Sequence, residues 1–357
     1  INPAEKTVTV RTLDSGKIYT ETYDKLLLAP GAKPTVPALS GVSSERVFTL
    51  RTVEDTLRIR HFVEDQKPKN AVLAGGGFIS LEMAENLTEM GVSVTIVQRP
   101  KQLLAPLDTD MASFVHAEMR RHGVTLRLGE TVTGFRQDGD SVLTLLEGSE
   151  PLHSDMVLLA IGVTPDTHLA KEAGLELGIR GSIAVNERME TSVPDIYAVG
   201  DAIEYPHPLT GKPWLNYLAN PANRQGRIVA DNMALGNTTS YEGAIGTSIA
   251  KVFDMTVAST GLAAKRLKQW GMEYQSSVTH SASHAGYYPD ALPLTLKLTF
   301  HPKTGKLYGA QCVGYEGVDK RIDQIAGLIK HGGTVYDLME TEHTYAPPFS
   351  SAKALLP

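Results

Sequence analysis

The sequence contains only one cysteine, Cys312, among its 357 residues. A single cysteine cannot form an intrachain disulfide, so the small disulfide-stapled folds are excluded and a reducing compartment is expected. The chain also lacks a strong charge of either sign, with 34 Lys and Arg against 40 Asp and Glu and a formal net charge of −6. Because no run of Lys or Arg breaks this balance, the composition argues against nucleic acid and anionic membrane surfaces as partners.

Long hydrophobic runs are absent as well. The longest apolar stretch, residues 156–163, is far shorter than the roughly 20 residues that span a bilayer. Residues 1–3, Ile-Asn-Pro, do not begin a signal peptide. We therefore expect a cytoplasmic protein with no membrane partner. What is present is an ordinary globular composition, 42% hydrophobic and 21% charged, and the length predicts two or three domains.

The first 34 residues carry β-strand signals. Polar and apolar residues alternate in 7–10 and 17–23 on either side of a turn at 14–16, which predicts a hairpin. The apolar residues 26–29 predict a buried strand that ends at the Pro- and Gly-containing residues 30–34. Because the chain begins inside this predicted sheet and without an initiator methionine, we expect it to be a fragment.

Strands and helices then alternate along the chain. Two strand–helix units in series predict a parallel, doubly wound α/β sheet of the Rossmann-like kind. Beyond residue 237 the pattern changes to that of an α+β module with an antiparallel sheet. The predicted helices are 52–65, 78–90, 111–121 (capped by Asp108 or Thr109) and 262–270. The predicted strands are 71–74, 92–97, 124–128, 156–161, 294–300 and 307–313, with a meander at 131–146 and a further segment of the antiparallel sheet at 247–260.

A glycine-rich segment, Gly75-Gly76-Gly77-Phe78-Ile79, lies between a predicted strand and a predicted helix. A dinucleotide-binding fingerprint has this setting: Gly75 permits the tight turn, Gly77 lets the backbone approach a pyrophosphate, and the helix N-terminus offers free N–H groups. Ser80 replaces the usual third glycine and is small enough for close helix–strand packing. The alternative is an ordinary glycine-rich turn, which the strand–turn–helix context disfavours.

Gln98 and Arg99 end the next predicted strand, where an NAD-selective site carries a carboxylate. Gln98 can hydrogen-bond a ribose without repelling a 2′-phosphate, and Arg99 can pair with that phosphate. The pattern therefore favours NADPH use or relaxed NADH/NADPH use. The alternative is that Arg99 is a solvated surface residue.

A further carboxylate, Asp201, follows Gly200 at the end of a β-rich run. Ligands of α/β sheets bind at the carboxyl ends of strands, and a carboxylate there can accept hydrogen bonds from polyol hydroxyls. By itself a Gly-Asp pair indicates only a turn, so this signal depends on the rest of the pattern.

Four segments occur in the order found in one family: residues 23–32, the glycine loop with Glu82, residues 160–165 and residues 196–201. In this order they resemble the pyridine nucleotide-disulfide oxidoreductase flavoproteins. Residues 218–227, 286–289, 317–323 and 345–350 are most similar to the coenzyme A-disulfide reductases within that family. The resemblance covers essentially the whole chain and implies FAD- and NAD(P)-binding Rossmann-like domains followed by an α+β dimerisation domain.

The resemblance also implies domain boundaries, cofactors and partners. Residues 1–68 and 191–240 would belong to the FAD-binding domain, 69–190 to the NAD(P)-binding domain and 241–357 to the dimerisation domain. It implies a homodimer with FAD and NAD(P)H as cofactors, and coenzyme A as a substrate or bound ligand.

Roles for single residues follow from the same resemblance. Asp201, with Gly200, would hold the FAD ribityl chain, and Gly31 would lie beside the flavin dinucleotide. Ala219 and Ala222 would pass near the isoalloxazine ring. On the nicotinamide side, the resemblance places Glu82 at the nicotinamide–flavin stack, Gly162 in the NAD(P)H groove, and Phe78 and Ile79 beside the glycine loop.

Tyr288 and Tyr345 are the candidate catalytic residues. In the family they reach across the dimer toward the partner's active-site sulfur, where a phenol can stabilise developing thiolate charge. The alternatives are interface packing for Tyr288 and a turn anchor for Tyr345. Asn223 and Arg224 are weaker candidates for contact with the substrate.

Two parts of the family pattern are missing. The first glycine fingerprint, which binds the ADP half of FAD, and the redox-active cysteine both precede the segment where this sequence begins. Cys312 does not replace that cysteine, because no neighbouring His or Lys would lower its thiol pKa, and a small buried hydrophobe is the better interpretation. His280 and His284 have metal-ligand spacing, but their Ser and Gly neighbours argue against a helix. Asp319, Arg321 and Asp323 are expected to form a charged helix face.

The sequence thus predicts a flavoprotein disulfide reductase that passes electrons from NAD(P)H through FAD to a cysteine-linked disulfide, such as coenzyme A disulfide or a persulfide. One alternative is an NADH oxidase or peroxidase of the same fold, in which the cysteine cycles through sulfenic acid. The other is a non-catalytic nucleotide-binding and dimerisation fragment.

Overall fold

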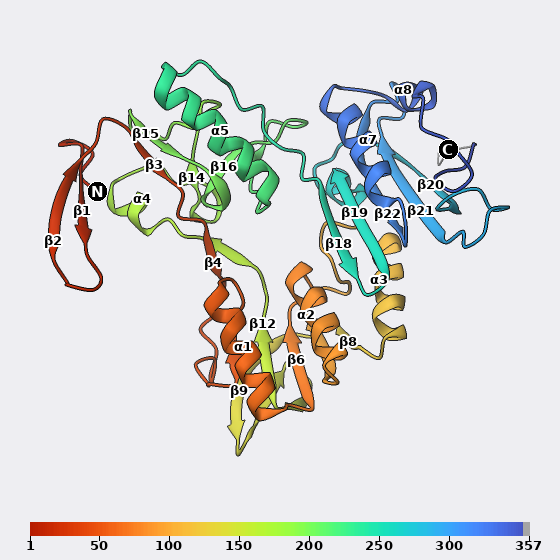
Figure 1. Cartoon of the computed structure of the whole chain (residues 1–357), viewed down its shortest axis with the longest axis horizontal. Coiled ribbons are helices and arrows are strands. Elements are labelled where there is room, and N and C mark those ends of the chain that lie inside the picture. Colours follow the sequence, from red (N-terminus) through yellow and green to blue (C-terminus); the bar gives the residue numbers. More distant parts are fainter. Residues whose placement is uncertain (353–357) are drawn as a thin grey trace. The chain divides into compact units, whose positions relative to one another are not determined.

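The computed structural model describes residues 1–352, which form two compact units (Figure 1). The first unit contains residues 1–33 and 163–246, and the second contains residues 34–162 and the chain from 247 onward. Among the described residues, no helix has both the length and the apolar character that a membrane span requires. The domain boundaries at 68, 190 and 240 stay predictions.

The first unit is built around two short parallel strands. β3 (Leu26–Leu28) pairs with β15 (Ile196–Ala198), and the buried side chains of Leu28 and Val229 belong to the core that joins these strands to α5 (Ala219–Leu235). The other elements of this part of the chain are β1 (Thr7–Arg11), β2 (Ile18–Thr22), β4 (Ala32–Pro34), β13 (Val163–Pro165), α4 (His168–Glu172), β14 (Ile183–Ala184), β16 (Ile203–Pro206), β17 (Pro213–Trp214) and 3-10 turns at Ile179–Gly181 and Gly200–Ala202.

The predicted N-terminal hairpin is confirmed. β1 and β2 pair antiparallel, with Thr7 opposite Thr22. The prediction of a wholly buried strand at 26–29 is wrong in part, because Leu28 is buried whereas Leu27 is 37% exposed. Leu27 and Leu28 are successive residues of a strand, so their side chains point to opposite faces, and only the face of Leu28 packs against the core.

The second unit contains the predicted parallel sheet. Its order is β5-β12-β6-β7-β8, and every neighbouring pair is parallel. The strands are β5 (Val47–Phe48), β6 (Asn70–Ala74), β7 (Ser93–Gln98), β8 (Thr125–Leu128) and β12 (Met156–Leu159). The Rossmann-like parallel sheet predicted from the alternating pattern is therefore confirmed.

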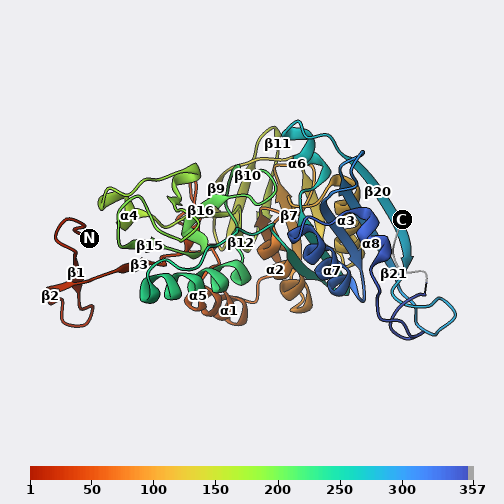
Figure 2. The ribbon, with the colours of Figure 1, turned by 90° about the horizontal axis from the view of Figure 1, so that it is seen from above.

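Both faces of this sheet are covered. Leu73 and Ile96 pack against a layer of helices, whereas their neighbours Val72 and Val97 pack against an antiparallel meander, because successive strand side chains point to opposite faces. The two layers are visible in Figure 2, where α1 and α2 lie on one side and the meander on the other. The helices are α1 (Val53–Gln66), α2 (Phe78–Glu89) and α3 (Thr109–Arg121), and the meander is β9 (Val132–Asp138), β10 (Ser141–Leu146) and β11 (Ser149–Ser154).

The C-terminal part of the second unit is an antiparallel sheet of order β18-β19-β22-β21-β20 with α7 packed against β19 and β22. The segment 247–260, predicted as one stretch, is a hairpin that turns at 253–254. β20 was not predicted, because its sequence QSSVTHSA offers few apolar residues to reveal a strand. The elements are β18 (Ser248–Val252), β19 (Met255–Gly261), α6 (Ala264–Gln269), β20 (Gln275–Ala282), β21 (Pro293–Phe300), β22 (Leu307–Gly314), α7 (Val318–Lys330) and α8 (Val335–Glu340).

Asp108 occupies the N-cap position of α3, as predicted, but its carboxylate caps a different helix. It accepts hydrogen bonds from the backbone N–H groups of Ala264 (3.0 Å) and Lys265 (2.9 Å) at the start of α6. The side chains of Gln311 (2.8 Å) and Lys297 (3.0 Å) also donate to it. Asp108 therefore ties the parallel-sheet part of the second unit to its antiparallel sheet.

Candidate functional site

The glycine loop of the second unit follows β6 and leads into α2. Gly75 has φ +115°, and a Cβ there would clash with the carbonyl oxygen of Ala160. Its N–H donates to Val97 O at 2.8 Å, which holds the loop against the neighbouring strand. Only glycine fits this position, as the predicted tight turn requires.

Gly77 begins α2 with an extended backbone and without a capping side chain in the described structure. A Cβ on Gly77 would meet no atom within 4 Å among the described residues, so the backbone is open to a ligand there. The first N–H groups of α2, at Phe78 and Ile79, therefore lie at a helix N-terminus without a side-chain cap, the kind of position at which phosphate groups bind. Ser80 is fully buried, which agrees with its predicted role in close helix–strand packing.

Gln98 lies against this loop. A Cβ on Gly76 would approach the Gln98 side chain to 3.1 Å, so the residue ending β7 and the glycine loop are neighbours. The backbone oxygen of Gln98 accepts from Gly129 N at 2.8 Å, which fixes the strand end. Arg99 is exposed beside it. The structure therefore places Gln98, and with it the adjacent Arg99, next to the glycine loop, as expected if both contact the ribose of a bound NAD(P)H.

Two further residues of the predicted NAD(P)H site lie in the same unit. Gly162 follows β12, the strand adjacent to β6, and has φ +121°. Its carbonyl accepts a hydrogen bond from Thr35 N at 2.9 Å. Glu82 is exposed on α2, one turn after Phe78, so the two share a helix face.

In the first unit, the residues predicted to contact FAD surround the ends of β3 and β15. Gly31 follows β3 with φ +71°, and Gly200 follows β15 with φ +79°. Because these strands are parallel neighbours, Gly31 and Asp201 come after adjacent carboxyl ends, where α/β sheets bind ligands.

Helix α5 borders this strand end. A Cβ on Gly200 would lie 3.9 Å from the Cβ of Ala222, and Gly200 N donates to the side chain of Gln225 at 2.8 Å. Gln225 is buried and was not predicted; its signal was its position one turn after Ala222 on the same helix face. Ala219, Asn223 and Arg224 are exposed on α5, so the two candidate substrate residues are accessible.

The two candidate tyrosines are both partly exposed in the second unit, but Tyr345 pairs with a residue that the sequence did not single out. The hydroxyl groups of Tyr287 and Tyr345 lie 2.8 Å apart. This hydrogen bond raises the pKa of Tyr287. Tyr288 instead makes an edge contact with the ring of His284, with centroids 5.7 Å apart. The only sequence signal for Tyr287 was its place in the segment 286–289.

Two family patterns match the chain. The pattern described as pyridine nucleotide-disulphide oxidoreductase matches residues 1–226, and that of the dimerisation domain of the same family matches residues 247–355. The chain belongs to the pyridine nucleotide-disulphide oxidoreductases. Membership implies FAD and NAD(P)H as cofactors, and the dimerisation domain indicates a homodimer.

Similar proteins span the whole chain. Coenzyme A disulfide reductase of Staphylococcus aureus (strain JH9) is 34% identical over 356 residues, which are 100% of this chain and 79% of the relative. The solved structure of reduced Bacillus anthracis CoADR-RHD is 47% identical with a TM-score of 0.96, and that of a NAD-dependent persulfide reductase from A. fulgidus is 35% identical with a TM-score of 0.95. Each structure covers 100% of this chain, whereas the chain spans 64% and 65% of those proteins.

Within this family fold, Cys312 lies in the middle of β22 and is fully buried. Burial raises the pKa of its thiol to about 12. A thiol with this pKa is not a nucleophile near neutral pH. The interpretation of Cys312 as a small core residue therefore agrees with its environment.

The remaining polar candidates, His280, His284 and Arg321, make hydrogen bonds within the protein. His280 lies on β20 and contacts Thr295 Oγ1 at 2.9 Å, whereas His284 lies beyond the strand and contacts a backbone oxygen, so they form no helical metal pair. Residues 319–323 are helical, as predicted, but Arg321 is not on a solvated face. It is buried and donates to the carbonyl oxygens of Gly317 (2.8 Å) and Ser283 (2.9 Å).

Proposed function

We propose that this chain is part of a homodimeric FAD- and NAD(P)H-dependent disulfide reductase whose substrate is coenzyme A disulfide or a related low-molecular-weight disulfide or persulfide. The observation that carries the proposal is the Tyr287–Tyr345 hydroxyl pair, which presents two phenols on an accessible part of the dimerisation domain. Coenzyme A disulfide reductase of S. aureus and the persulfide reductase of A. fulgidus, both at least 34% identical, support the substrate class.

The residues at the two strand ends would hold the two cofactors. Gly75 and Gly77, with the open N-terminus of α2, would bind the NAD(P)H pyrophosphate, and Gln98 with Arg99 would bind the ribose and its phosphate. In the first unit, Asp201 would accept hydrogen bonds from the FAD ribityl chain beside Gly31, Ala219 and Ala222. When bound, the nicotinamide supplies a hydride and the flavin passes the two electrons on toward the disulfide.

The tyrosines would stabilise the thiolate that leaves when the disulfide is cleaved. Cleavage of a disulfide releases a thiolate, and an O–H donor within reach lowers the energy of the developing negative charge. Tyr345 would donate that hydrogen bond, and Tyr287 would orient the Tyr345 hydroxyl through the 2.8 Å contact. A role for Tyr288 stays a prediction. Asn223 and Arg224 on α5 would contact polar groups of the substrate.

The test is the oxidation of NADPH and NADH by the protein expressed from its complete gene. We expect rapid oxidation with coenzyme A disulfide or a coenzyme A persulfide, and slow oxidation with hydrogen peroxide or oxygen alone. Turnover with peroxide or oxygen but not with any disulfide would instead assign the protein to the NADH oxidase or peroxidase class. A protein that binds nucleotide but oxidises neither cofactor with any acceptor would refute the proposal.

A further inference from the structure

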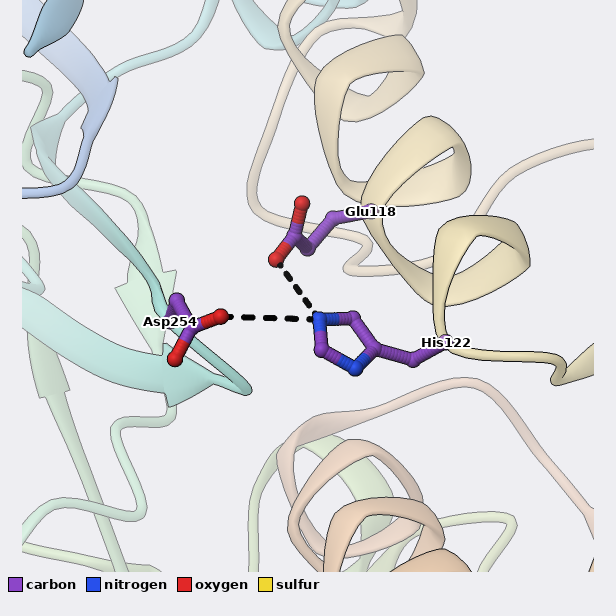
Figure 3. Close-up of side chains that lie close together, drawn as sticks. All are labelled: Glu118, His122 and Asp254. Atoms are coloured by element: carbon purple, nitrogen blue, oxygen red, sulfur yellow. Dashed lines mark hydrogen bonds and ion pairs between the residues drawn. The ribbon is translucent and has the colours of Figure 1, made fainter.

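Three side chains with metal-ligand atoms meet in the second unit, away from the glycine loop (Figure 3). Glu118 lies in the last turn of α3, His122 caps that helix, and Asp254 lies in the turn between β18 and β19. His122 Nε2 is 3.2 Å from Glu118 Oε1 and 3.7 Å from Asp254 Oδ2. The ligand atoms of all three residues lie within 4.8 Å of one another.

These separations fit the edges of a tetrahedron around a metal ion. With bonds of about 2.1 Å, two ligand atoms of a tetrahedral zinc site lie about 3.4 Å apart. The spacing of Glu118 and His122 by four residues puts both on one face of α3. One imidazole nitrogen and two carboxylate oxygens form a ligand set for Zn²⁺ and similar borderline divalent ions, with a fourth position left for water.

The ligands are held in place by their surroundings. The His122 ring stacks flat on Phe253, with centroids 3.9 Å apart and planes at 3°. The Glu118 carboxylate is only 2% exposed, and the Tyr315 hydroxyl donates to its second oxygen at 3.4 Å. Outer contacts of this kind orient metal ligands and strengthen binding. Asp254 is 71% exposed, so an ion can enter from solvent.

A cation already occupies this position. The Arg121 terminal nitrogen donates to Glu118 Oε1 at 2.6 Å and to Asp254 Oδ2 at 3.2 Å, the two oxygens that face His122. The two carboxylates outnumber this one guanidinium, and a divalent ion that displaced Arg121 would contact both of them. The Arg121 side chain is 54% exposed and can turn into solvent when an ion enters.

We propose that Glu118, His122 and Asp254 form a divalent metal site of the zinc class that competes with Arg121. A bound ion would link the end of α3 to the β18–β19 hairpin and so connect the nucleotide-binding and dimerisation parts of the second unit. This inference does not depend on the proposed disulfide substrate.

Binding of ZnCl₂ to tag-free, chelator-treated protein from the complete gene tests the site by isothermal titration calorimetry. We expect one zinc ion per chain at this site and a binding constant reduced about 100-fold or more in His122→Gln and Asp254→Asn. Removing the competing guanidinium in Arg121→Gln should tighten binding about tenfold. The matched control is His153→Gln, which alters another histidine–carboxylate pair, 3.4 Å from Asp138, and should bind zinc as the wild type does.

Differences between variants separate zinc bound at this site from zinc bound elsewhere on the protein. Co²⁺ adds a spectroscopic readout: nitrogen and oxygen ligands give visible bands without a thiolate charge-transfer band. Unchanged zinc binding in both His122→Gln and Asp254→Asn would overturn the proposal, as would a weaker site in Arg121→Gln. Circular dichroism checks folding, and Asp254→Asn, in an exposed turn, carries the test if His122→Gln fails to fold.

Discussion

The hydroxyl groups of Tyr287 and Tyr345 lie 2.8 Å apart although 58 positions separate them in the chain. The loop that contains Tyr287 also contacts the C-terminal segment through its backbone, where Ala285 N donates to Pro347 O. The pairing is therefore a property of two packed segments rather than of two flexible side chains that happen to meet.

The Tyr287–Tyr345 pair predicts which tyrosine substitutions lower kcat for disulfide reduction most. We expect Tyr345→Phe to lower kcat about 10- to 100-fold, because it removes a hydrogen bond to a charged group, and Tyr287→Phe to lower it about 2- to 10-fold, because it removes a neutral one. Tyr288→Phe keeps the ring contact with His284 and removes only the hydroxyl, so its kcat tests the predicted catalytic role of Tyr288 directly. An unchanged kcat in Tyr287→Phe would contradict the orienting role assigned to Tyr287.

The glycine loop gives a matched pair of variants. Gly75→Ala should destabilise the protein by about 1–3 kcal/mol, because alanine at φ +115° is strained and its Cβ meets Ala160. Gly77→Ala has space for the methyl group and should change the free energy of unfolding by no more than about 0.5 kcal/mol. It should nevertheless raise KM for NAD(P)H, since the methyl group keeps the backbone from the pyrophosphate. Urea unfolding and steady-state kinetics separate these effects; an unchanged KM in Gly77→Ala would contradict the assignment.

Arg99 predicts the choice of cofactor. We expect the wild type to use NADPH at least as well as NADH. Arg99→Ala should lower kcat/KM for NADPH about 10- to 100-fold by removing a charged hydrogen bond, with little change for NADH. A hundredfold preference of the wild type for NADH would show that Arg99 is only a surface residue.

Asp108 predicts a loss of stability at low pH. Burial alone would raise its pKa, but hydrogen bonds from Lys265 N, Gln311 and Lys297, with the charge of Lys297, outweigh burial and lower the pKa. A lowered pKa means that the contribution of Asp108 is fully present above its unfolded pKa of about 3.9 and is lost as the pH falls through its folded pKa.

Substitution tests the same network near neutral pH. Asp108→Asn should cost about 3 kcal/mol, because it removes one partner of a buried ion pair. Asp110→Asn removes the other carboxylate that pairs with Lys297. Because the Asp110 side chain is 54% exposed, this substitution should cost no more than about 1 kcal/mol. Urea unfolding at pH 7 measures both costs, and unfolding at a series of pH values below 4 follows the loss of the Asp108 contribution. Equal costs at pH 7 would contradict the proposed importance of burial.

Cys312 should take no part in electron transfer. With its thiol buried and its pKa raised to about 12, Cys312→Ala is expected to leave kcat unchanged. Alkylation by iodoacetamide should reach Cys312 only after unfolding, as mass spectrometry of the labelled peptide can show. A large fall in kcat in Cys312→Ala, with folding intact, would require a direct role for this thiol.

The sequence by itself determined the local features of this protein. Sequence patterns located four of the five strands of the parallel sheet and the three helices beside it, but not the two-residue strand β5. The glycine at position 75 predicted a turn that only glycine can make. These signals depend on a few neighbouring residues. The same holds for the burial of Cys312, whose neighbours are apolar.

Only the tertiary structure decided which distant side chains meet. The Tyr287–Tyr345 pair, the four hydrogen-bond donors around Asp108 and the cluster of Glu118, His122 and Asp254 each join segments whose order in the chain gives no sign of contact. Asp108 shows the physical reason: its residue type and position predict a cap for α3, but packing of the antiparallel sheet brings the N-terminus of α6 and the Lys297 ammonium within 3.0 Å of its carboxylate. Sequence rules consider only hydrogen-bond partners within a few residues, whereas tertiary packing brings in partners that are distant in the sequence.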